Sequence, residues 1–436
     1  MTLRSLLATL LKNRVAKNAS WIIAGRIAQM CVSFVVGLLT ARYLGPSNQG
    51  LLSYGGAYTA FFTSFCTLGI NDVIVRELIS RPDKQGEVLG TSMVLREISS
   101  VLSVFVILMV VLIVDGGEQT TIAVVALCSI GVVFNVLDIF QYWFQASLKS
   151  KVTAITSLVA YIITAAYKVV LMATGKSVIF FALASSVDYI CIGVLLMIAY
   201  HRHGGQKLRF SWLYGKKLLK NSTPFILTGL MVAVYGQTDK YMLKQMIGSS
   251  EIGFYSTAVS LCTIWCFVLS AIIQSMYPVI MEAFERSEEE FLDRNRLLYA
   301  IVFYLCISVS IFFTLFARPI ISILYGESYL PTVGPLRIIT WYTAFSYLGV
   351  ARNAWIVCKN RQRYLKYVYV GAAIANVILN LLLIPRWGAS GAAAASLAAQ
   401  IITTMVIPFF IPALRENSML MLESIRLKGI LKKKSQ

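Results

Sequence analysis

The sequence predicts an all-α polytopic membrane protein, with about 12 transmembrane helices in two pseudo-symmetric six-helix bundles around a central cavity. Composition is the first observation, because 58% of the 436 residues are hydrophobic and 14% are charged, against roughly 45 to 50% and 25% in an average soluble domain. The second is a succession of apolar stretches of about 20 residues, the length that crosses a bilayer as a helix. The third is an internal repeat. Together they exclude a soluble fold.

Hydropathy predicts the positions of the membrane spans. Those of the first half are residues 20–41, 50–70, 93–114, 121–142, 152–173 and 178–200. Those of the second half are residues 223–246, 254–277, 297–317, 336–358, 365–385 and 391–413. The chain is therefore expected to comprise a cytoplasmic interfacial segment (1–19), an N-terminal bundle (20–200), a cytoplasmic linker (201–222), a C-terminal bundle (223–413) and a basic cytoplasmic tail (414–436).

The basic residues predict the orientation of these spans. Most Lys and Arg residues fall in the two termini and in the alternate loops on the same side. The positive-inside rule places that side, and both termini, in the cytoplasm. The formal net charge of +19 would suggest nucleic-acid binding in a soluble protein, but no nucleic-acid motif accompanies it. We therefore interpret the charge as positive loops and expect no nucleic-acid partner.

The repeat relates the two halves at a nearly constant offset. A set of turn residues, Gly45, Ser47, Gly50 and Ser53, recurs 203 positions later as Gly248, Ser250, Gly253 and Ser256. Further along, Trp143 matches Trp355 at an offset of 212, a drift that fits loop insertion. Because six spans return the chain to its starting side, the repeat is parallel, related by an axis along the membrane normal.

Metal, cofactor and nucleotide sites are not expected. The eight cysteines lie in apolar stretches, where free Cys behaves as a small hydrophobe, so we expect no disulfides. His201 and His203 share one basic loop without further ligands, which is not a metal-site pattern. The segment Gly175-Lys176-Ser177 lacks the earlier glycine of a phosphate-binding loop, since Val170 stands there. An energy source other than ATP is expected.

Several stretches carry a family resemblance through their order and spacing. They are ARYLGP at 41–46, VREL at 75–78, YWFQA at 142–146, TDKYML at 238–243, GFYS at 253–256, and NLLLIP at 380–385 followed by Gly388, Gly391 and Ala392. Over nearly the whole chain they resemble the polysaccharide (O-antigen or capsule repeat-unit) flippases of the MATE-like MOP transporter superfamily.

The resemblance implies a flippase rather than an enzyme. Such a flippase moves an undecaprenyl-pyrophosphate-linked oligosaccharide from the cytoplasmic to the periplasmic leaflet of a bacterial inner membrane, by alternating access. The family's role would be polysaccharide biosynthesis, including lipopolysaccharide O-antigen. The partners implied are the lipid-linked oligosaccharide, membrane lipids, a coupling proton or sodium ion, and a polysaccharide polymerase complex.

Basic residues within the spans are candidates to bind the head group. Pyrophosphate and sugar lose their water in hydrocarbon, at several kcal/mol per unmet polar group, so we expect a basic cavity. Arg26, Lys168 and Arg352 lie in predicted spans, where a charge normally faces the bundle interior; snorkelling to the interface is the alternative. Arg76, beside Glu77 at the cytoplasmic end of the second span, is a further substrate-binding candidate, with an ordinary loop ion pair as the alternative.

Three aspartates within the predicted spans are the acidic candidates. Asp138, Asp188 and Asp239 are expected either to pair with those bases or to bind a coupling proton or sodium ion. Asp239 and Lys240 are about 100° apart on a helix, so they cannot share a face. We predict that Asp239 points inward and Lys240 outward; a local pair or an interfacial position is the alternative.

Two other functions stay open at this point. An ion-coupled multidrug antiporter of the same superfamily would share the fold but prefer an acidic cavity. A membrane glycosyltransferase or polymerase would usually carry a larger extramembrane catalytic portion. The longest predicted loop, 201–222, is too short for an independent domain, and no catalytic constellation is evident. We therefore expect no catalytic residues.

Overall fold

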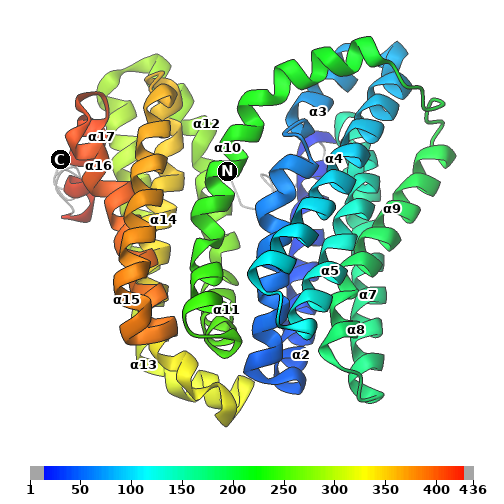
Figure 1. Ribbon diagram of the computed structural model, residues 1–436. Helices are drawn as coiled ribbons and strands as arrows, with labels where there is room; N and C mark the ends of the chain where they lie inside the picture. Colours follow the sequence, from blue (N-terminus) through cyan, green and yellow to red (C-terminus); the bar gives the residue numbers. More distant parts are fainter. Residues whose placement is uncertain (1–13, 427–436) are drawn as a thin grey trace. The chain divides into compact units, whose positions relative to one another are not determined.

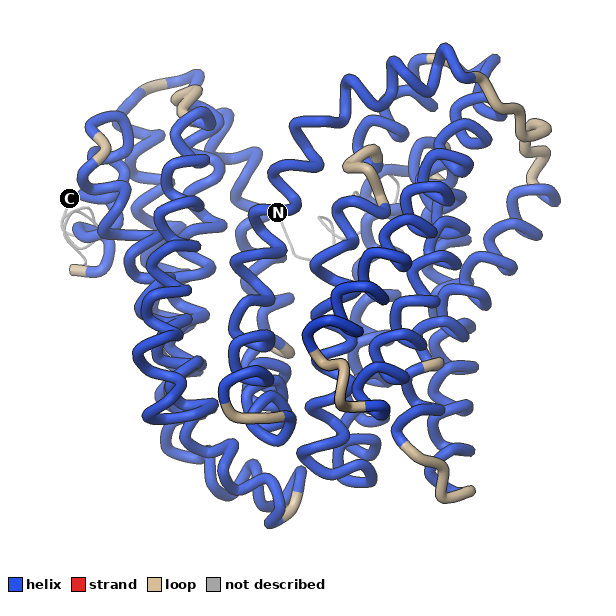
Figure 2. The backbone as a smooth tube through the Cα atoms, viewed as in Figure 1, coloured by secondary structure: helices blue, strands red, loops and turns tan. Residues whose placement is uncertain are grey.

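The computed structural model is helical throughout the part of the chain that it describes (Figures 1 and 2). It describes the backbone of residues 14–426, and their side chains except those of 14–24, 26, 72, 224, 225, 227, 228, 232 and 235. No strand occurs within 14–426. The predicted all-α polytopic class is confirmed. Most of the predicted 1–19 segment and the last residues of the tail lie outside the described range.

The chain forms two compact units. The N-terminal unit comprises Met1–Leu44 and Leu51–Ala233, and the C-terminal unit comprises Gly45–Gly50 and Val234–Gln436. The boundary falls inside a helix, because α10 (Trp212–Met246) continues from one unit into the other. The predicted linker 201–222 is therefore not separate: its second half is already helical.

The helices that precede α10 lie between Arg14 and Arg202. They are α2 (Arg14–Cys66), α3 (Asn71–Ser80), η1 (Pro82–Lys84), α4 (Gln85–Val114), α5 (Gln119–Phe134), η2 (Asn135–Ile139), α6 (Phe140–Ala146), α7 (Ser150–Ala173), α8 (Val178–Ala182) and α9 (Ala184–Arg202). Those that follow α10 are α11 (Ser249–Thr263), α12 (Cys266–Arg286), α13 (Glu288–Tyr325), η3 (Glu327–Thr332), α14 (Val333–Cys358), η4 (Gln362–Tyr364), α15 (Leu365–Ile401), the π-helix η5 (Ile402–Val406), α16 (Ile407–Phe410) and α17 (Pro412–Ile425).

Two long helices each cover a pair of predicted spans. In α2 the break falls at Gly45, with φ 74° and ψ 171°, and in α15 it falls at Gly388, with φ 55° and ψ −131°. Glycine adopts positive φ without the steric cost that a Cβ imposes. The loops predicted at 42–49 and 386–390 are thus sharp breaks in otherwise helical backbone.

Length and apolarity support the membrane assignment. Within the described residues, eight helical segments are long and apolar enough to cross a membrane. Two of them, Ile27–Cys66 and Gln362–Phe410, have 40 and 49 residues and cover the four spans just mentioned. The chain is therefore a multi-pass membrane protein. The merged helices account for two of the four predicted spans without a segment of their own, and the other two, 223–246 and 336–358, lie in α10 and α14, which are not among the eight.

Each unit has its own apolar core. The repeat-related tryptophans lie in these cores: Trp143 packs with Phe140 and Tyr200, and Trp355 packs with Tyr299 and Leu348. Aromatic side chains bury large areas, so these positions stabilise the helix packing of both units. The internal repeat thus extends to equivalent core positions.

The loop between α9 and α10 is fastened to the start of α4. The Arg209 amide donates to the Gly86 carbonyl at 3.0 Å, and the Gly86 amide donates to Gln206 Oε1 at 2.9 Å. A Cβ on Gly86 would come 2.2 Å from the Lys207 carbonyl oxygen, so this close approach requires glycine. The loop therefore belongs structurally to the N-terminal unit.

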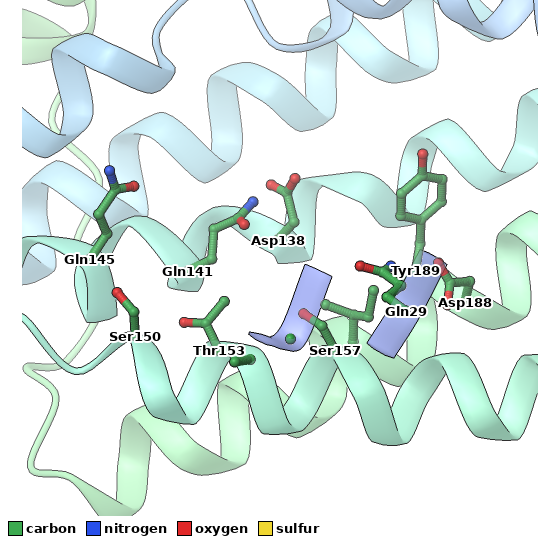
Figure 3. A pocket seen from close by; sticks show the side chains of 12 residues that line it. Gln29, Asp138, Gln141, Gln145, Ser150, Thr153, Ser157, Asp188 and Tyr189 are labelled. Atoms are coloured by element: carbon green, nitrogen blue, oxygen red, sulfur yellow. The ribbon is translucent and has the colours of Figure 1, made fainter. Parts of the chain in front are cut away.

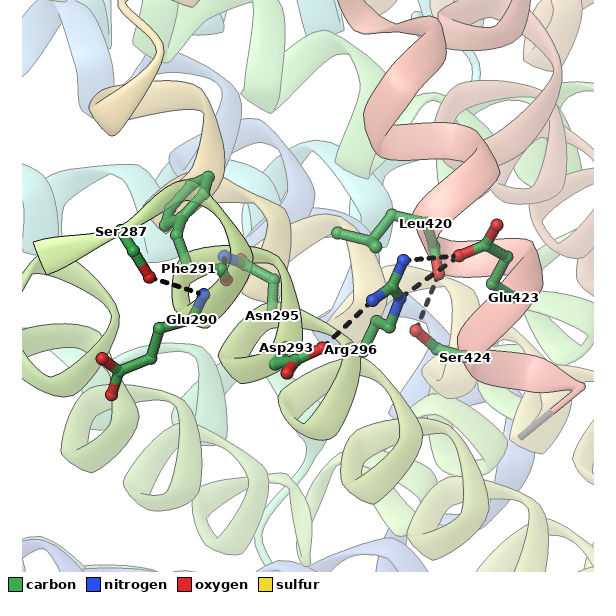
Figure 4. Close-up of polar contacts among 9 residues, drawn as sticks. All are labelled: Ser287, Glu290, Phe291, Asp293, Asn295, Arg296, Leu420, Glu423 and Ser424. Atoms are coloured by element: carbon green, nitrogen blue, oxygen red, sulfur yellow. Dashed lines mark hydrogen bonds and ion pairs between the residues drawn. The ribbon is translucent and has the colours of Figure 1, made fainter. Parts of the chain in front are cut away.

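The predicted tail begins as an ordered helix on α13 (Figure 4). Arg296 of α13 lies between two acids, 3.0 Å from Glu423 Oε2 of α17 and 3.1 Å from Asp293 Oδ1. Ser287 caps the N-terminus of α13 by accepting from the Glu290 amide. The ion pairs hold α17 against the end of α13, so the first part of the tail is not a solvated segment.

Candidate functional site

A polar cavity of about 440 Å³ lies within the N-terminal unit. Its walls come from α2, from the η2–α6 segment, from α7 and from α9 (Figure 3). The lining residues are Gly25, Gln29, Asp138, Gln141, Gln145, Ser150, Thr153, Ala154, Ser157, Asp188, Tyr189 and Ile192. The volume falls in the range of small-molecule sites, about 300 to 1,000 Å³, but most of these residues are polar.

Two rows of polar side chains line this cavity (Figure 3). Residues 138, 141 and 145 form one row along η2 and α6, and residues 150, 153 and 157 form the other along α7. Both rows have the i, i+3, i+7 spacing that places side chains on one helix face. The turn at Leu148, with φ 53°, reverses the chain between them, so the two rows run antiparallel.

Several of these polar groups have no hydrogen-bond partner in the part of the chain that the structure describes. Among the described residues, the side chains of Gln29, Gln141, Gln145 and Ser157 take part in no hydrogen bond. The Thr153 hydroxyl is buried and likewise unpartnered. An unmet polar group is costly in an apolar environment, and membrane helices offer little else to bind. The cavity is therefore built to hold water or a hydrogen-bonding ligand.

Asp138 faces the cavity with an arginine behind it. Arg96 of α4 places Nη1 2.9 Å from Asp138 Oδ1, with side-chain exposures of 1% and 21% respectively. Arg96 Nη2 also donates to Asn135 Oδ1 at 3.1 Å. The ion pair thus offsets the carboxylate charge from the core side and leaves the carboxylate itself open to the cavity.

Asp188 on α9 lines the cavity at the end away from Gln145 (Figure 3). Its Oδ1 accepts a hydrogen bond from Thr164 of α7 at 3.3 Å. Lys168, one turn further along α7, interacts electrostatically with Asp188 but does not line the cavity. The structure thus brings the predicted residues Asp138 and Asp188 to one cavity and places Lys168 behind the second of them.

Asp239 is the centre of a second polar cluster, in the C-terminal unit. It lies on α10 and is 4% exposed. Its Oδ2 accepts from the Tyr255 hydroxyl at 2.6 Å and from the Ser396 hydroxyl. Its Oδ1 accepts from Asn380 Nδ2 at 2.6 Å and Asn376 Nδ2 at 3.1 Å. Four hydrogen-bond donors thus converge on the two carboxylate oxygens.

A small cavity of about 110 Å³ adjoins this cluster. Asp239, Tyr255, Asn376 and Ser396 line it, and the buried Asn380 Oδ1 beside it has no partner among the described residues. The cluster offers a carboxylate, amide oxygens and hydroxyls, which are the oxygen ligands of hard cations. The carboxylate is also a proton acceptor.

Arg352 lies in the core of the C-terminal unit. Its side chain is 2% exposed, and Nη1 approaches the carbonyls of Thr403 and Thr404 at 3.5 and 3.4 Å. Both carbonyls belong to the π-helix Ile402–Val406, where the usual helical hydrogen-bond pattern is disrupted. Arg352 lines neither of the two cavities, and its role in substrate binding stays a prediction.

Arg76 is exposed on α3. The acid beside it, Glu77, pairs with Arg81 at 3.3 Å instead, and it also accepts from the Tyr214 hydroxyl at 3.3 Å. Burial, and then the Glu77 carboxylate, raise the pKa of Tyr214, so the hydroxyl stays protonated as a donor. Arg76 therefore stays available for another partner. The remaining candidate, the Arg26 side chain, lies outside the described residues.

The family follows from a comparison with known proteins. Residues 15–284 match the model of a family described as polysaccharide biosynthesis protein, which is more than half of the chain. The chain belongs to the polysaccharide biosynthesis protein family. This membership and the solved structures below confirm the resemblance to the MOP superfamily. An uncharacterized membrane protein of Methanocaldococcus jannaschii is 20% identical, over 94% of this chain and 86% of that protein.

Solved structures show that this member of the polysaccharide biosynthesis protein family has the MOP-superfamily fold. The lipid II flippase MurJ in an inward closed conformation has a TM-score of 0.71 at 14% identity, covering 96% of this chain and 93% of that one. An inward-facing multidrug resistance MATE transporter of the MOP superfamily has a TM-score of 0.67 at 14% identity, covering 92% and 96%. The chain therefore belongs to the polysaccharide biosynthesis protein family and shares its fold with a flippase and with MATE transporters.

The uncharged polar side chains of both sites are not among the residues that the sequence of this family member predicts. The glutamine and hydroxyl rows of the first cavity have a recognisable signal, polar side chains at i, i+3 and i+7 in apolar helices. Arg96 was overlooked although it lies in a predicted span. The partners of Asp239 come from α11 and α15, more than 130 positions away for Asn376, Asn380 and Ser396, and nothing in a single sequence indicates that contact.

Proposed function

We propose that the protein is a flippase that moves undecaprenyl-pyrophosphate-linked oligosaccharide repeat units from the cytoplasmic to the periplasmic leaflet. The observation that carries the proposal is the polar cavity of the N-terminal unit, with unpartnered hydrogen-bonding groups among membrane-spanning helices. Cargo hydroxyls would take the place of water there. Membership of the polysaccharide biosynthesis protein family supports a saccharide cargo, and no covalent chemistry is needed.

The lipid and the head group pose different demands during this movement. The polyprenyl tail stays in the bilayer, whereas the pyrophosphate and sugars need polar partners throughout. Arg76 is exposed and is proposed to meet the incoming pyrophosphate, for which the guanidinium fork is suited. Arg26 follows Gly25, which lines the cavity, and is proposed to bind the head group there, with Lys168 behind Asp188 as a further basic group. Alternating access of the two units would complete the transfer.

The Asp239 cluster is proposed to couple transport to an ion. Its carboxylate, two asparagines and hydroxyls suit a proton or a sodium ion. Asp138 and Asp188 serve in this proposal as acceptors in the cargo cavity. We place the protein in a bacterial inner membrane, with both termini cytoplasmic, among membrane lipids and a polysaccharide polymerase complex.

Deletion of the gene tests the proposal. The deletion strain is expected to accumulate a lipid-linked oligosaccharide accessible only from the cytoplasmic leaflet, and the wild-type gene is expected to reverse it. Thr156→Val serves as a matched complementing control, because this hydroxyl bonds only the backbone of its own helix. If no lipid-linked sugar accumulates and the strain instead becomes sensitive to cationic drugs, the protein is a multidrug antiporter and the proposal is wrong.

A further inference from the structure

We infer that the cavity of the N-terminal unit binds sugar residues of the cargo through neutral groups, and that it selects uncharged sugars over acidic sugars. The inference rests on the proposed function and specifies the ligand class of that site. It depends on three features of the cavity: the length of the two polar rows, the balance of donors and acceptors along them, and the position of the charges.

The rows have the dimensions of a saccharide site. Each runs over eight residues, from 138 to 145 and from 150 to 157, which is roughly 10 Å along a helix. The open ends of the rows, Gln145 and Ser150, lie beside the turn between α6 and α7, which the positive-inside rule predicts to be cytoplasmic. A saccharide chain entering from that side would meet polar groups continuously.

The polar groups match the hydroxyls of a sugar. Each hydroxyl both donates and accepts, and a glutamine amide offers two donors and a carbonyl acceptor. Gln29, Gln141 and Gln145 present such amides with no partner among the described residues. Thr153 and Ser157 add hydroxyls from the opposite row, and the two carboxylates add acceptors. A polyhydroxylated neutral ligand would satisfy this set, whereas an apolar ligand would leave it unmet.

The charges disfavour both anions and cations. The cavity lining contains two carboxylates and, among described side chains, no Lys or Arg, so a uronic acid would meet Asp138 and Asp188. A cationic ligand gains little, because Arg96 already pairs with Asp138 and Lys168 interacts with Asp188. Among the described lining residues only Tyr189 is aromatic, too few for the aromatic cage that quaternary ammonium ligands favour.

Two isosteric changes, one on α7 and one on α6, separate cargo binding from stability. Thr153→Val in combination with Gln141→Met removes two hydrogen-bonding groups from the cavity at nearly constant volume. Because the Thr153 hydroxyl is buried and unpartnered, its loss should leave stability unchanged or higher. Thr156→Val is the matched control, since Thr156 lies on α7 but bonds only Val152 and Thr153 carbonyls and does not line the cavity.

The test measures transbilayer movement of two cargos in proteoliposomes. One is undecaprenyl-pyrophosphate carrying a neutral oligosaccharide, and the other carries the same oligosaccharide with one sugar replaced by its uronic acid. We expect the wild type to move the neutral cargo at least about tenfold faster than the acidic one. The double variant should move the neutral cargo about tenfold more slowly than the control, the loss expected for two hydrogen bonds.

The outcomes distinguish the inference from the proposed function. If the wild type moves both cargos at equal rates, or if the double variant matches the control, the sugar-selective cavity is wrong while the flippase stands. If the wild type moves neither cargo although it is folded and inserted, the proposed function is wrong and the inference fails with it. Movement of a lipophilic cation in place of both cargos would identify the antiporter.

Discussion

The free energy of unfolding lost with the Arg96–Asp138 ion pair should depend strongly on which of the two partners is replaced. Arg96 is 1% exposed and Asp138 is 21% exposed on the cavity wall. Asp138→Asn leaves the guanidinium charge buried, with only Asn135 as a hydrogen-bond partner. Arg96→Met leaves a carboxylate that faces the cavity and is rehydrated there. The two variants remove the same ion pair but strand charges in different environments.

The magnitudes follow from these environments. Removing one partner of a buried pair costs about 3 to 5 kcal/mol. The contacts of Arg96 with Asn135 place Asp138→Asn near the lower limit, about 3 kcal/mol. Arg96→Met should cost about 1 kcal/mol, since the stranded charge is partly solvated. The double variant strands no charge, so it should be about as stable as Arg96→Met and more stable than Asp138→Asn.

Unfolding of the purified protein by sodium dodecyl sulfate in mild-detergent micelles measures these differences. Glu282→Gln is the control, because Glu282 and its partner Arg286 are 63% and 60% exposed and such a pair contributes about 0 to 1 kcal/mol. A larger loss of unfolding free energy for Arg96→Met than for Asp138→Asn would refute the reasoning. The reasoning would also be refuted if the double variant lost as much free energy of unfolding as the two single variants together. Such additivity is expected of independent sites and not of two residues that form one ion pair.

Three further predictions concern other parts of the chain. Gly45→Ala should lower the free energy of unfolding by about 1 to 3 kcal/mol through backbone strain alone, and Gly388→Ala by more, because its Cβ would also come 2.4 Å from a carboxylate oxygen of Glu251. Arg352→Met should leave stability unchanged or raised, since apolar replacements of buried charges are often neutral or stabilising. Asp239→Asn should abolish the dependence of transport on an ion gradient, because an amide cannot hold the charge.

Each of these has a result that would contradict it. Thermal melts decide the glycine pair, and equal losses at Gly45 and Gly388 would show that the Glu251 contact is irrelevant. For Arg352→Met, a stable protein that no longer transports would show that this arginine binds cargo, whereas a strongly unstable one would show that the contacts to the π-helix matter. For Asp239→Asn, unchanged gradient dependence, compared with gradient-dependent wild type, would remove this cluster from ion coupling.

The sequence predicted the helical class and the buried charges better than it predicted their partners. A carboxylate within an apolar stretch has to be compensated, so Asp138, Asp188 and Asp239 were recognisable without any structure. Their partners were not, because Arg96 and Asn376 are brought to them by helix packing between distant parts of the chain. Only tertiary structure specifies such pairs.

Neutral polar groups and backbone breaks were the other parts that sequence did not predict. A glutamine costs less than a charge in a membrane and attracts less notice, yet Gln141 and Gln145 are two of the three residues of one polar row. The glycines at 45 and 388 were expected in loops, and their positive φ values are the only non-helical backbone in two long helices. Arg352 shows the converse: an intramembrane charge that was expected in a cavity lies in the core.

Transbilayer movement of one defined cargo by the purified protein tests the central claim most directly. The protein is reconstituted into liposomes that carry fluorescent undecaprenyl-pyrophosphate-linked neutral oligosaccharide, and an impermeant glycosidase reports the leaflet that each glycan occupies. We predict that the wild type exposes glycan from the inner leaflet far faster than protein-free liposomes do. Equal rates with and without folded, inserted protein would contradict the account.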